Sequence, residues 1–94
     1  MVRIEVFTKP GCGGCERLKE DISQTDLSEI TVYKTIKGKE GYENLSYIKR
    51  KGFDNIPVIR VFTPLREDFL VGYHPIEQIR EKIDAVIEVH NRWK

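Results

Sequence analysis

Two cysteines three positions apart are the residues of this chain with the clearest capacity for chemistry. Cys12 and Cys15 enclose two glycines, and no other cysteine occurs among the 94 residues. Thiols at this spacing can close a small disulfide ring or point together at a metal ion. In a reducing compartment such a pair is more often catalytic or metal-binding than structural. The spacing favours thiol–disulfide exchange and leaves a metal half-site, an inert disulfide or a binding module without redox activity as alternatives.

The position of the pair predicts different roles for the two sulfurs. Polar and apolar side chains alternate over residues 3–8, with an apolar pair near the end, and this pattern predicts a central strand. A Lys-Pro-Gly turn separates the strand from a helix predicted over 13–23. Cys12 would start that helix, where unpaired N–H groups and the helix dipole favour a thiolate. Cys15 falls on the apolar stripe of the helix. We therefore expect Cys12 to attack and the more buried Cys15 to resolve the mixed disulfide.

The neighbours of the pair predict how it is tuned and approached. Gly13 and Gly14 leave the approach to the sulfurs open and bring no charge, so the tuning would come from Lys9 and the backbone. Pro57 begins an apolar run, and beside a cysteine pair we predict a cis bond before it. That bond would present the backbone of Ile56 to an extended substrate strand.

The rest of the sequence predicts the elements that position this site. Joining the first two strands through a helix makes them parallel, and a short turn makes the last two an antiparallel hairpin. The expected result is an α/β fold with a four-stranded mixed sheet and helices on both faces, forming a single domain over residues 1–94. The further elements expected are an edge strand over 30–36, a helix over 42–51, strands over 56–62 and 68–71, and a helix from 75 to the chain end, with a polar connection over 24–29 and a turn over 63–67.

Charge and hydropathy limit the surroundings in which the chain is expected to work. Sixteen basic and 15 acidic residues give a formal net charge of +1, so nothing favours nucleic acid or an acidic membrane as partner. The start lacks the pattern of a secretory signal, and no apolar run could span a bilayer. We therefore expect a soluble, cytoplasmic protein. The basic run at 49–51 is expected to be a solvated helix end, with a docking patch as the alternative.

Three segments, residues 6–15, 55–58 and 71–75, resemble the glutaredoxins and, within them, the small glutaredoxin-like hydrogen donors of ribonucleotide reductase, the NrdH-redoxins. The order of elements matches that family over about residues 2–90. The resemblance implies a thioredoxin-like, glutaredoxin-type fold of order βαβαββα. It also implies an enzyme, a dithiol oxidoreductase that reduces protein disulfides.

The resemblance assigns roles to five residues of the first two segments. Cys12 matches the family nucleophile and Cys15 the resolving thiol. Lys9 matches a lysine that lies near the thiolate and can contact a glutathione carboxylate. Pro57 matches the cis-proline of the family, and Ile56 supplies the backbone that pairs with substrate.

The third segment departs from the common glutaredoxin pattern. Gly72 matches the first glycine after the last strand, but residues 73–75 replace the second glycine and the acid that help to hold glutathione. They look like the Gly-aromatic-Arg-Pro segment of the redoxins, which take electrons from thioredoxin reductase. Tyr73 would line a substrate groove or cover the sheet. His74 is expected to cap the last helix, with an influence on thiol acidity as the alternative.

The same resemblance leads to expectations about partners and cofactors. The resemblance implies a monomer with no tightly bound cofactor, whose electrons come from glutathione or from a thioredoxin reductase. Its substrates would be protein disulfides, with ribonucleotide reductase as a candidate. The alternative is a dimer in which two cysteine pairs supply four thiolates to zinc or to an iron–sulfur cluster.

Overall fold

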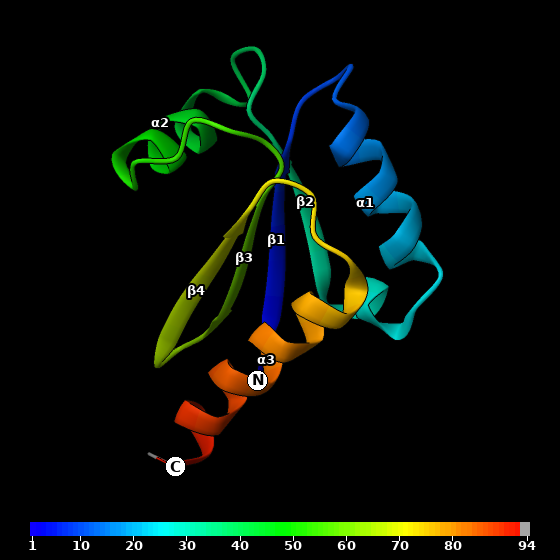
Figure 1. The fold of residues 1–94 in the computed structure, drawn as a ribbon. Helices are drawn as coiled ribbons and strands as arrows, with labels where there is room; N and C mark the ends of the chain where they lie inside the picture. Colours follow the sequence, from blue (N-terminus) through cyan, green and yellow to red (C-terminus); the bar gives the residue numbers. More distant parts are fainter. Residues whose placement is uncertain (93–94) are drawn as a thin grey trace.

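The computed structural model describes residues 1–92, with side chains through residue 89. Its sheet has the strand order β2-β1-β3-β4, in which β1 and β2 are parallel and the other neighbours antiparallel. The predicted four-stranded mixed α/β sheet with three helices is therefore confirmed (Figure 1). The elements are β1 (Arg3–Thr8), α1 (Gly13–Ser23), the 3-10 helix η1 (Asp26–Ile30), β2 (Thr31–Thr35), α2 (Tyr42–Arg50), β3 (Val58–Thr63), β4 (Arg66–Val71) and α3 (Ile76–Arg92).

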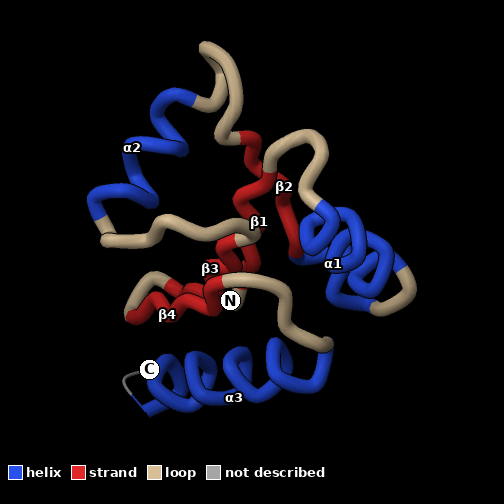
Figure 2. The backbone as a smooth tube through the Cα atoms, turned by 45° about the horizontal axis from the view of Figure 1, so that its top comes forward, coloured by secondary structure: helices blue, strands red, loops and turns tan. Residues whose placement is uncertain are grey.

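The sheet separates two apolar clusters because side chains alternate along each strand. Ile4 and Val6 of β1 point to the face covered by α1 and α3. The larger cluster lies there and includes Leu18, Ile22 and Ile79. Figure 2 shows these two helices and α2 arranged around the central strands. The smaller cluster, under α2, consists of Phe7, Ile48 and Val58.

Several element boundaries differ from the predictions. The connection expected to be irregular contains η1, because Leu27 is buried to 5% exposure and the Thr25 side chain caps the turn. The third strand starts at Val58, after Pro57, and β4 starts at Arg66, so the hairpin turn is shorter than predicted. The last helix begins one residue after Pro75. Its predicted end at residues 93–94 lies outside the described residues.

A chain of ion pairs crosses the part of the α2 face that the helix leaves uncovered. Lys34 of β2 lies 3.3 Å from Glu5 of β1, and Arg60 of β3 lies 2.9 Å from Glu5 and 2.8 Å from Glu67 of β4. Lys51, just after α2, closes the chain at 2.7 Å from Glu67. These charges, of which Lys51 is exposed and the others are partly buried, link all four strands, and no local pattern in the sequence predicts them.

Glu67 makes this network sensitive to pH. The hydrogen bond from Lys51, assisted by Arg60 and Tyr47, lowers the pKa of Glu67 from 4.5 to about 2, against partial burial that raises it. A lowered pKa means that the network stabilises the fold above pH 4.5 and that this contribution is lost as the pH falls toward 2. Since the site is partly open to screening water, we expect Glu67→Gln to lower the free energy of unfolding at neutral pH by about 1 kcal/mol.

Urea denaturation at several pH values measures this effect. The difference between wild type and Glu67→Gln should shrink as the pH falls from 4.5 toward 2. Glu81→Gln, on the exposed side of α3, serves as the matched control. A difference that stays constant over this pH range would contradict the assignment.

Candidate redox-active site

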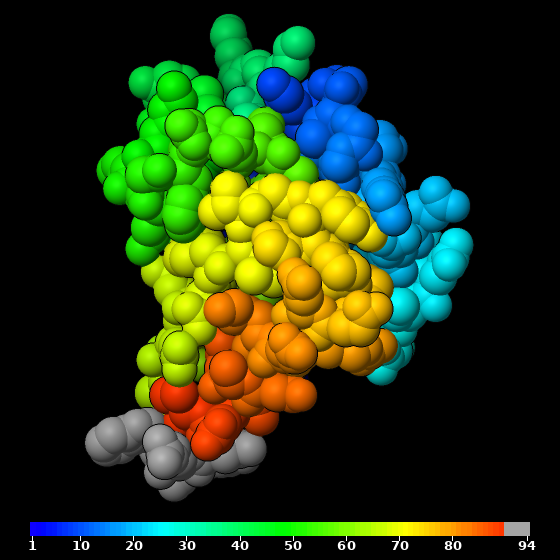
Figure 3. All heavy atoms as spheres, in the orientation of Figure 1, coloured from blue at the N-terminus to red at the C-terminus, as the bar shows by residue number. Residues whose placement is uncertain are grey.

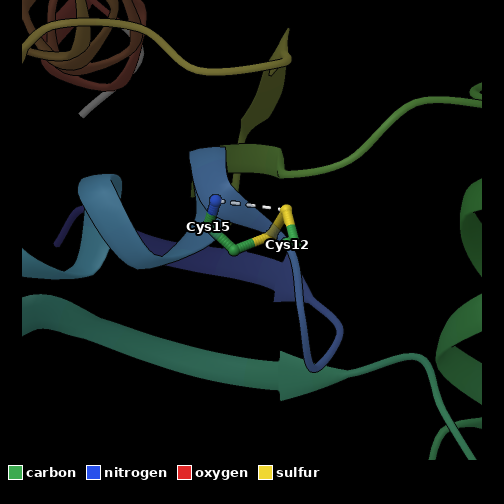
Figure 4. The surroundings of a disulfide bond; sticks show 2 residues. All are labelled: Cys12 and Cys15. Carbon is green, nitrogen blue, oxygen red and sulfur yellow. Dashed lines mark hydrogen bonds between the residues drawn. A yellow bond between two sulfur atoms is a disulfide. The ribbon is translucent and has the colours of Figure 1, made fainter.

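The two cysteines form a disulfide at the start of α1 (Figure 4). Their Cα atoms are 5.2 Å apart. Cys15 is 1% exposed, whereas Cys12 is partly exposed. The helix occupies residues 13–23, as predicted. The predicted difference in burial between the two sulfurs is confirmed.

The sulfur of Cys12 acts as the N-cap of α1. The backbone N–H of Cys15 donates to Cys12 Sγ at 3.2 Å, and the N–H of Glu16 donates to the Cys12 carbonyl at 3.1 Å. Gly11, with φ of +76°, makes the tight turn that brings the chain from β1 into this position. A donor aimed at Cys12 Sγ would favour the thiolate over the thiol once the disulfide is opened.

The two glycines of the motif have different surroundings. A Cβ added at Gly13 would meet no atom within 4 Å, so this position is open as predicted. A Cβ added at Gly14 would lie 3.4 Å from Cδ of Pro57 and 3.6 Å from Cβ of Tyr73. Gly14 therefore faces the protein rather than the approach to the sulfurs.

This contact shows that the three sequence segments converge. The Ile56–Pro57 bond is cis, which confirms the prediction. The carbonyl of Pro57 accepts a hydrogen bond of 2.7 Å from the N–H of Gly72, the residue before Tyr73. Pro57 is buried and Ile56 is partly exposed beside it. Lys9 is exposed in the loop that leads from β1 to Cys12.

Tyr73 lies against α1. Its hydroxyl donates to Asp21 Oδ2 at 2.5 Å, and the Arg17 guanidinium lies 4.6 Å from the centre of its ring. The hydrogen bond to Asp21 is the main cause of a raised pKa at Tyr73. Sequence reasoning missed both partners, although residues 14, 17 and 21 have the spacing of one helical face.

The His74 ring contacts the side chain of Gln78, in the first turn of α3. One ring nitrogen lies 2.6 Å from Gln78 Oε1 and the other 3.1 Å from the Val71 carbonyl. The predicted cap would have used a backbone N–H of the helix as donor. The ring instead joins the end of β4 to the side chain of Gln78.

The described residues 1–92 show neither a metal centre within one chain nor a membrane-spanning helix. No group of three or more His, Cys, Asp or Glu side chains in the described part of the chain is arranged to hold a metal ion. The alternative of a metal or cluster shared between two chains stays a prediction. Over the same residues, no helix is long and apolar enough to cross a membrane.

Comparisons with known proteins show the fold. No family model and no curated protein matches the sequence. Chloroplastic thioredoxin z is similar in structure, with a TM-score of 0.68 and 20% identity over 94% of this chain and 80% of that chain. Reduced thioredoxin pre-protein of Schistosoma mansoni gives a TM-score of 0.67 and 15% identity over 90% and 78% of the two chains. Thioredoxin of Malassezia sympodialis (Mala s 13) gives 0.59 and 20% over 90% and 74%.

At sequence identities of 15–20%, the similarity to these proteins is a similarity of fold. The fold is thioredoxin-like, as predicted. The resemblance to glutaredoxins or to NrdH-redoxins within this fold stays a prediction, and so do the roles that it assigns to individual residues.

Proposed function

We propose that this thioredoxin-fold chain is a thiol–disulfide oxidoreductase that reduces protein disulfides through Cys12 and Cys15. One observation carries the proposal. A partly exposed sulfur caps the N-terminus of α1, receives a backbone N–H at 3.2 Å and has a second, buried sulfur within bonding distance. This arrangement supplies a stabilised nucleophile and a resolving group.

The exchange proceeds in two steps from the reduced chain. The Cys12 thiolate attacks one sulfur of the substrate disulfide; that bond breaks, a mixed disulfide forms, and the other substrate sulfur leaves as a thiolate that takes up a proton. Cys15 then loses its proton and attacks Cys12 Sγ. The mixed disulfide breaks and the second substrate thiolate is released. Two electrons have passed to the substrate, and the chain holds the Cys12–Cys15 disulfide.

Neighbouring residues support these steps. Lys9 places a positive charge in the loop before Cys12, which favours the thiolate. Ile56, partly exposed beside Pro57, offers backbone groups to an extended substrate segment. Hydrogen bonds from Gly72 to Pro57 and from Tyr73 to Asp21 of α1 fix the segment after β4 in place.

The resemblance to NrdH-redoxins supports a more specific proposal about the electron donor and the substrate protein. The chain would work as a cytoplasmic monomer without a bound cofactor, and ribonucleotide reductase is a candidate target. Offering the oxidised protein either glutathione or thioredoxin reductase with NADPH distinguishes the two donors. Faster reduction by the reductase would favour the NrdH-redoxin subtype, and faster reduction by glutathione the glutaredoxin subtype.

Insulin reduction and thiol alkylation test the general proposal. With dithiothreitol as electron source, wild-type protein should accelerate the precipitation of reduced insulin. In the reduced protein, one thiol should react with iodoacetamide well below the pH expected for a free cysteine of pKa ~8.5. An unaltered insulin rate, or a Cys12 thiol as weakly acidic as free cysteine and unreactive, would overturn the proposal.

A further inference from the structure

Charge is distributed unevenly over this nearly neutral chain. Residues 34–51 contain six Lys or Arg and two Glu, whereas the whole chain has a formal net charge of +1. All other positions together hold ten basic and thirteen acidic residues. The segment that comprises the end of β2, the following loop and α2 is thus a positive region in an otherwise negative molecule.

The six basic residues of this segment fall into two groups. Lys34 and Lys51 belong to the ion-pair chain across the sheet. The remaining four cations are exposed, and none is placed in an ion pair with the side chains that the structure describes. With the exposed tyrosine of the same region they form a surface that we call the basic patch: Lys37, Lys39, Tyr42, Lys49 and Arg50.

The basic patch has features of a protein-binding surface. Tyr42, at the start of α2, is 71% exposed and so offers most of its ring to a binding partner. A hollow of about 440 Å³ lies beside it, bounded by Tyr42, Leu45, Ser46, Lys49 and Arg50. Tyrosine and arginine beside a hollow are typical of the residues that carry most of the energy of a protein interface.

The patch begins next to the redox-active site. The N–H of Ile36 donates to the Thr8 carbonyl at 2.9 Å, so the loop with Lys37 and Lys39 leaves the sheet where the loop to Cys12 also starts. The space-filling view shows the atoms of these two loops side by side at one end of the molecule (Figure 3). The end of the basic patch that holds Lys37 and Lys39 therefore starts beside the loop that leads to Cys12.

The other side of the cysteine pair has the opposite charge. Residues 13–30, which include α1 and η1, contain five acidic and two basic residues, and one of the acids, Asp26, is paired with Arg80 of α3 at 2.9 Å. Both basic side chains contact aromatic rings: Arg17 contacts Tyr73 and Lys19 contacts Tyr33. A partner that meets Cys12 thus experiences attraction on the α2 side and repulsion on the α1 side.

We infer that the basic patch docks an acidic protein surface that flanks the disulfide reduced at Cys12. The inference rests on the proposed function and adds the substrate class. Opposite charges on the two sides of Cys12 would orient the partner as well as attract it, because complementary fields guide encounter and suppress the reversed approach. A protein fits better than a nucleic acid, since the patch adjoins a group that acts on disulfides and the acidic side of the site would repel phosphates.

Three disulfide probes test the inference, with dithiothreitol as reductant. They are a cystine peptide flanked by aspartates, the same peptide flanked by lysines, and uncharged bis(2-hydroxyethyl) disulfide. At low ionic strength, the ratio of kcat/KM for the acidic peptide to that for the uncharged disulfide should fall about tenfold in Lys37→Glu/Lys39→Glu. The fall should largely disappear at about 0.5 M salt, where the Debye length is only a few ångströms.

Two control variants separate charge from position. Lys37→Arg/Lys39→Arg keeps the charge of the loop and should keep the ratio. Lys82→Glu makes one charge reversal on α3 and should change the ratio much less than the double reversal in the patch. The lysine-flanked peptide should respond in the opposite direction, with a higher ratio in Lys37→Glu/Lys39→Glu.

The outcomes also distinguish this inference from the proposed function. Ratios that are equal in wild type and Lys37→Glu/Lys39→Glu, with the uncharged disulfide still reduced, would overturn the docking surface alone. Failure of the wild type to reduce any of the three probes would overturn the proposed function and the inference with it. Tighter binding of a single-stranded oligonucleotide than of the acidic peptide, lost in the same variant, would assign the patch to nucleic acid and overturn the inference.

Discussion

Insulin reduction by the Cys12→Ser variant is expected to fall to the rate of dithiothreitol alone. Cys12 is the partly exposed sulfur that receives the Cys15 N–H at 3.2 Å, whereas Cys15 itself is 1% exposed. A serine hydroxyl at position 12 stays protonated at neutral pH and cannot replace a thiolate. We expect kcat/KM to fall on the order of 1000-fold or more. The measurement is the turbidity of reduced insulin with time.

Cys15→Ser is the matched control for this prediction, because it removes a sulfur at the same motif but keeps the nucleophile. The variant should still attack a disulfide once and should then accumulate a mixed disulfide, since no second thiol resolves it. Mass spectrometry should detect the adduct on Cys15→Ser and not on Cys12→Ser. Adducts of equal yield on the two variants would contradict the division of roles.

Phe7→Ala is expected to have the largest effect on stability. Phe7 is 2% exposed and forms the smaller apolar cluster with Ile48 and Val58. Its ring stacks on that of Tyr47 with centroids 5.7 Å apart. Truncation removes the ring that packs against Ile48 and Tyr47 of α2 and leaves a cavity. We expect the free energy of unfolding in urea to fall by about 3–5 kcal/mol.

Tyr42→Ala provides the comparison, because it truncates an aromatic ring of similar size that is 71% exposed. An exposed substitution of this kind should change the free energy of unfolding by about 0.5 kcal/mol or less. A loss at Phe7 no larger than the loss at Tyr42 would show that the α2 cluster contributes little to stability.

Local patterns in the sequence were sufficient to predict most elements and the arrangement of the cysteine pair. The spacing of Cys15, Leu18, Lys19 and Ile22 predicted the helix and a narrow buried face. Three of these side chains are buried, whereas Lys19 is exposed. Alternation in β1 predicted the strand with its observed bounds. These features depend on neighbours within one or two turns, which a periodic pattern can report.

Contacts between distant positions were not predictable in the same way. Arg60 and Glu5 are 55 positions apart, and Tyr73 and Asp21 are 52 apart. Such pairs exist only after the strands have adopted their register and the last loop has packed on α1. Leu27 was missed for a related reason, because a single apolar residue in a polar segment forms no pattern although the fold buries it.

The unequal surroundings of the two central glycines limit how this motif could vary. Pro57 and Tyr73 already lie in van der Waals contact with a Cβ added at Gly14, so alanine fits at this position and larger side chains meet these two residues. Gly13 is exposed, and a Cβ added there meets no atom within 4 Å, so a side chain can start at this position without a clash. A side chain introduced at position 13 would therefore change the surroundings of the cysteine pair and leave the packing of Gly14 on Pro57 and Tyr73 intact.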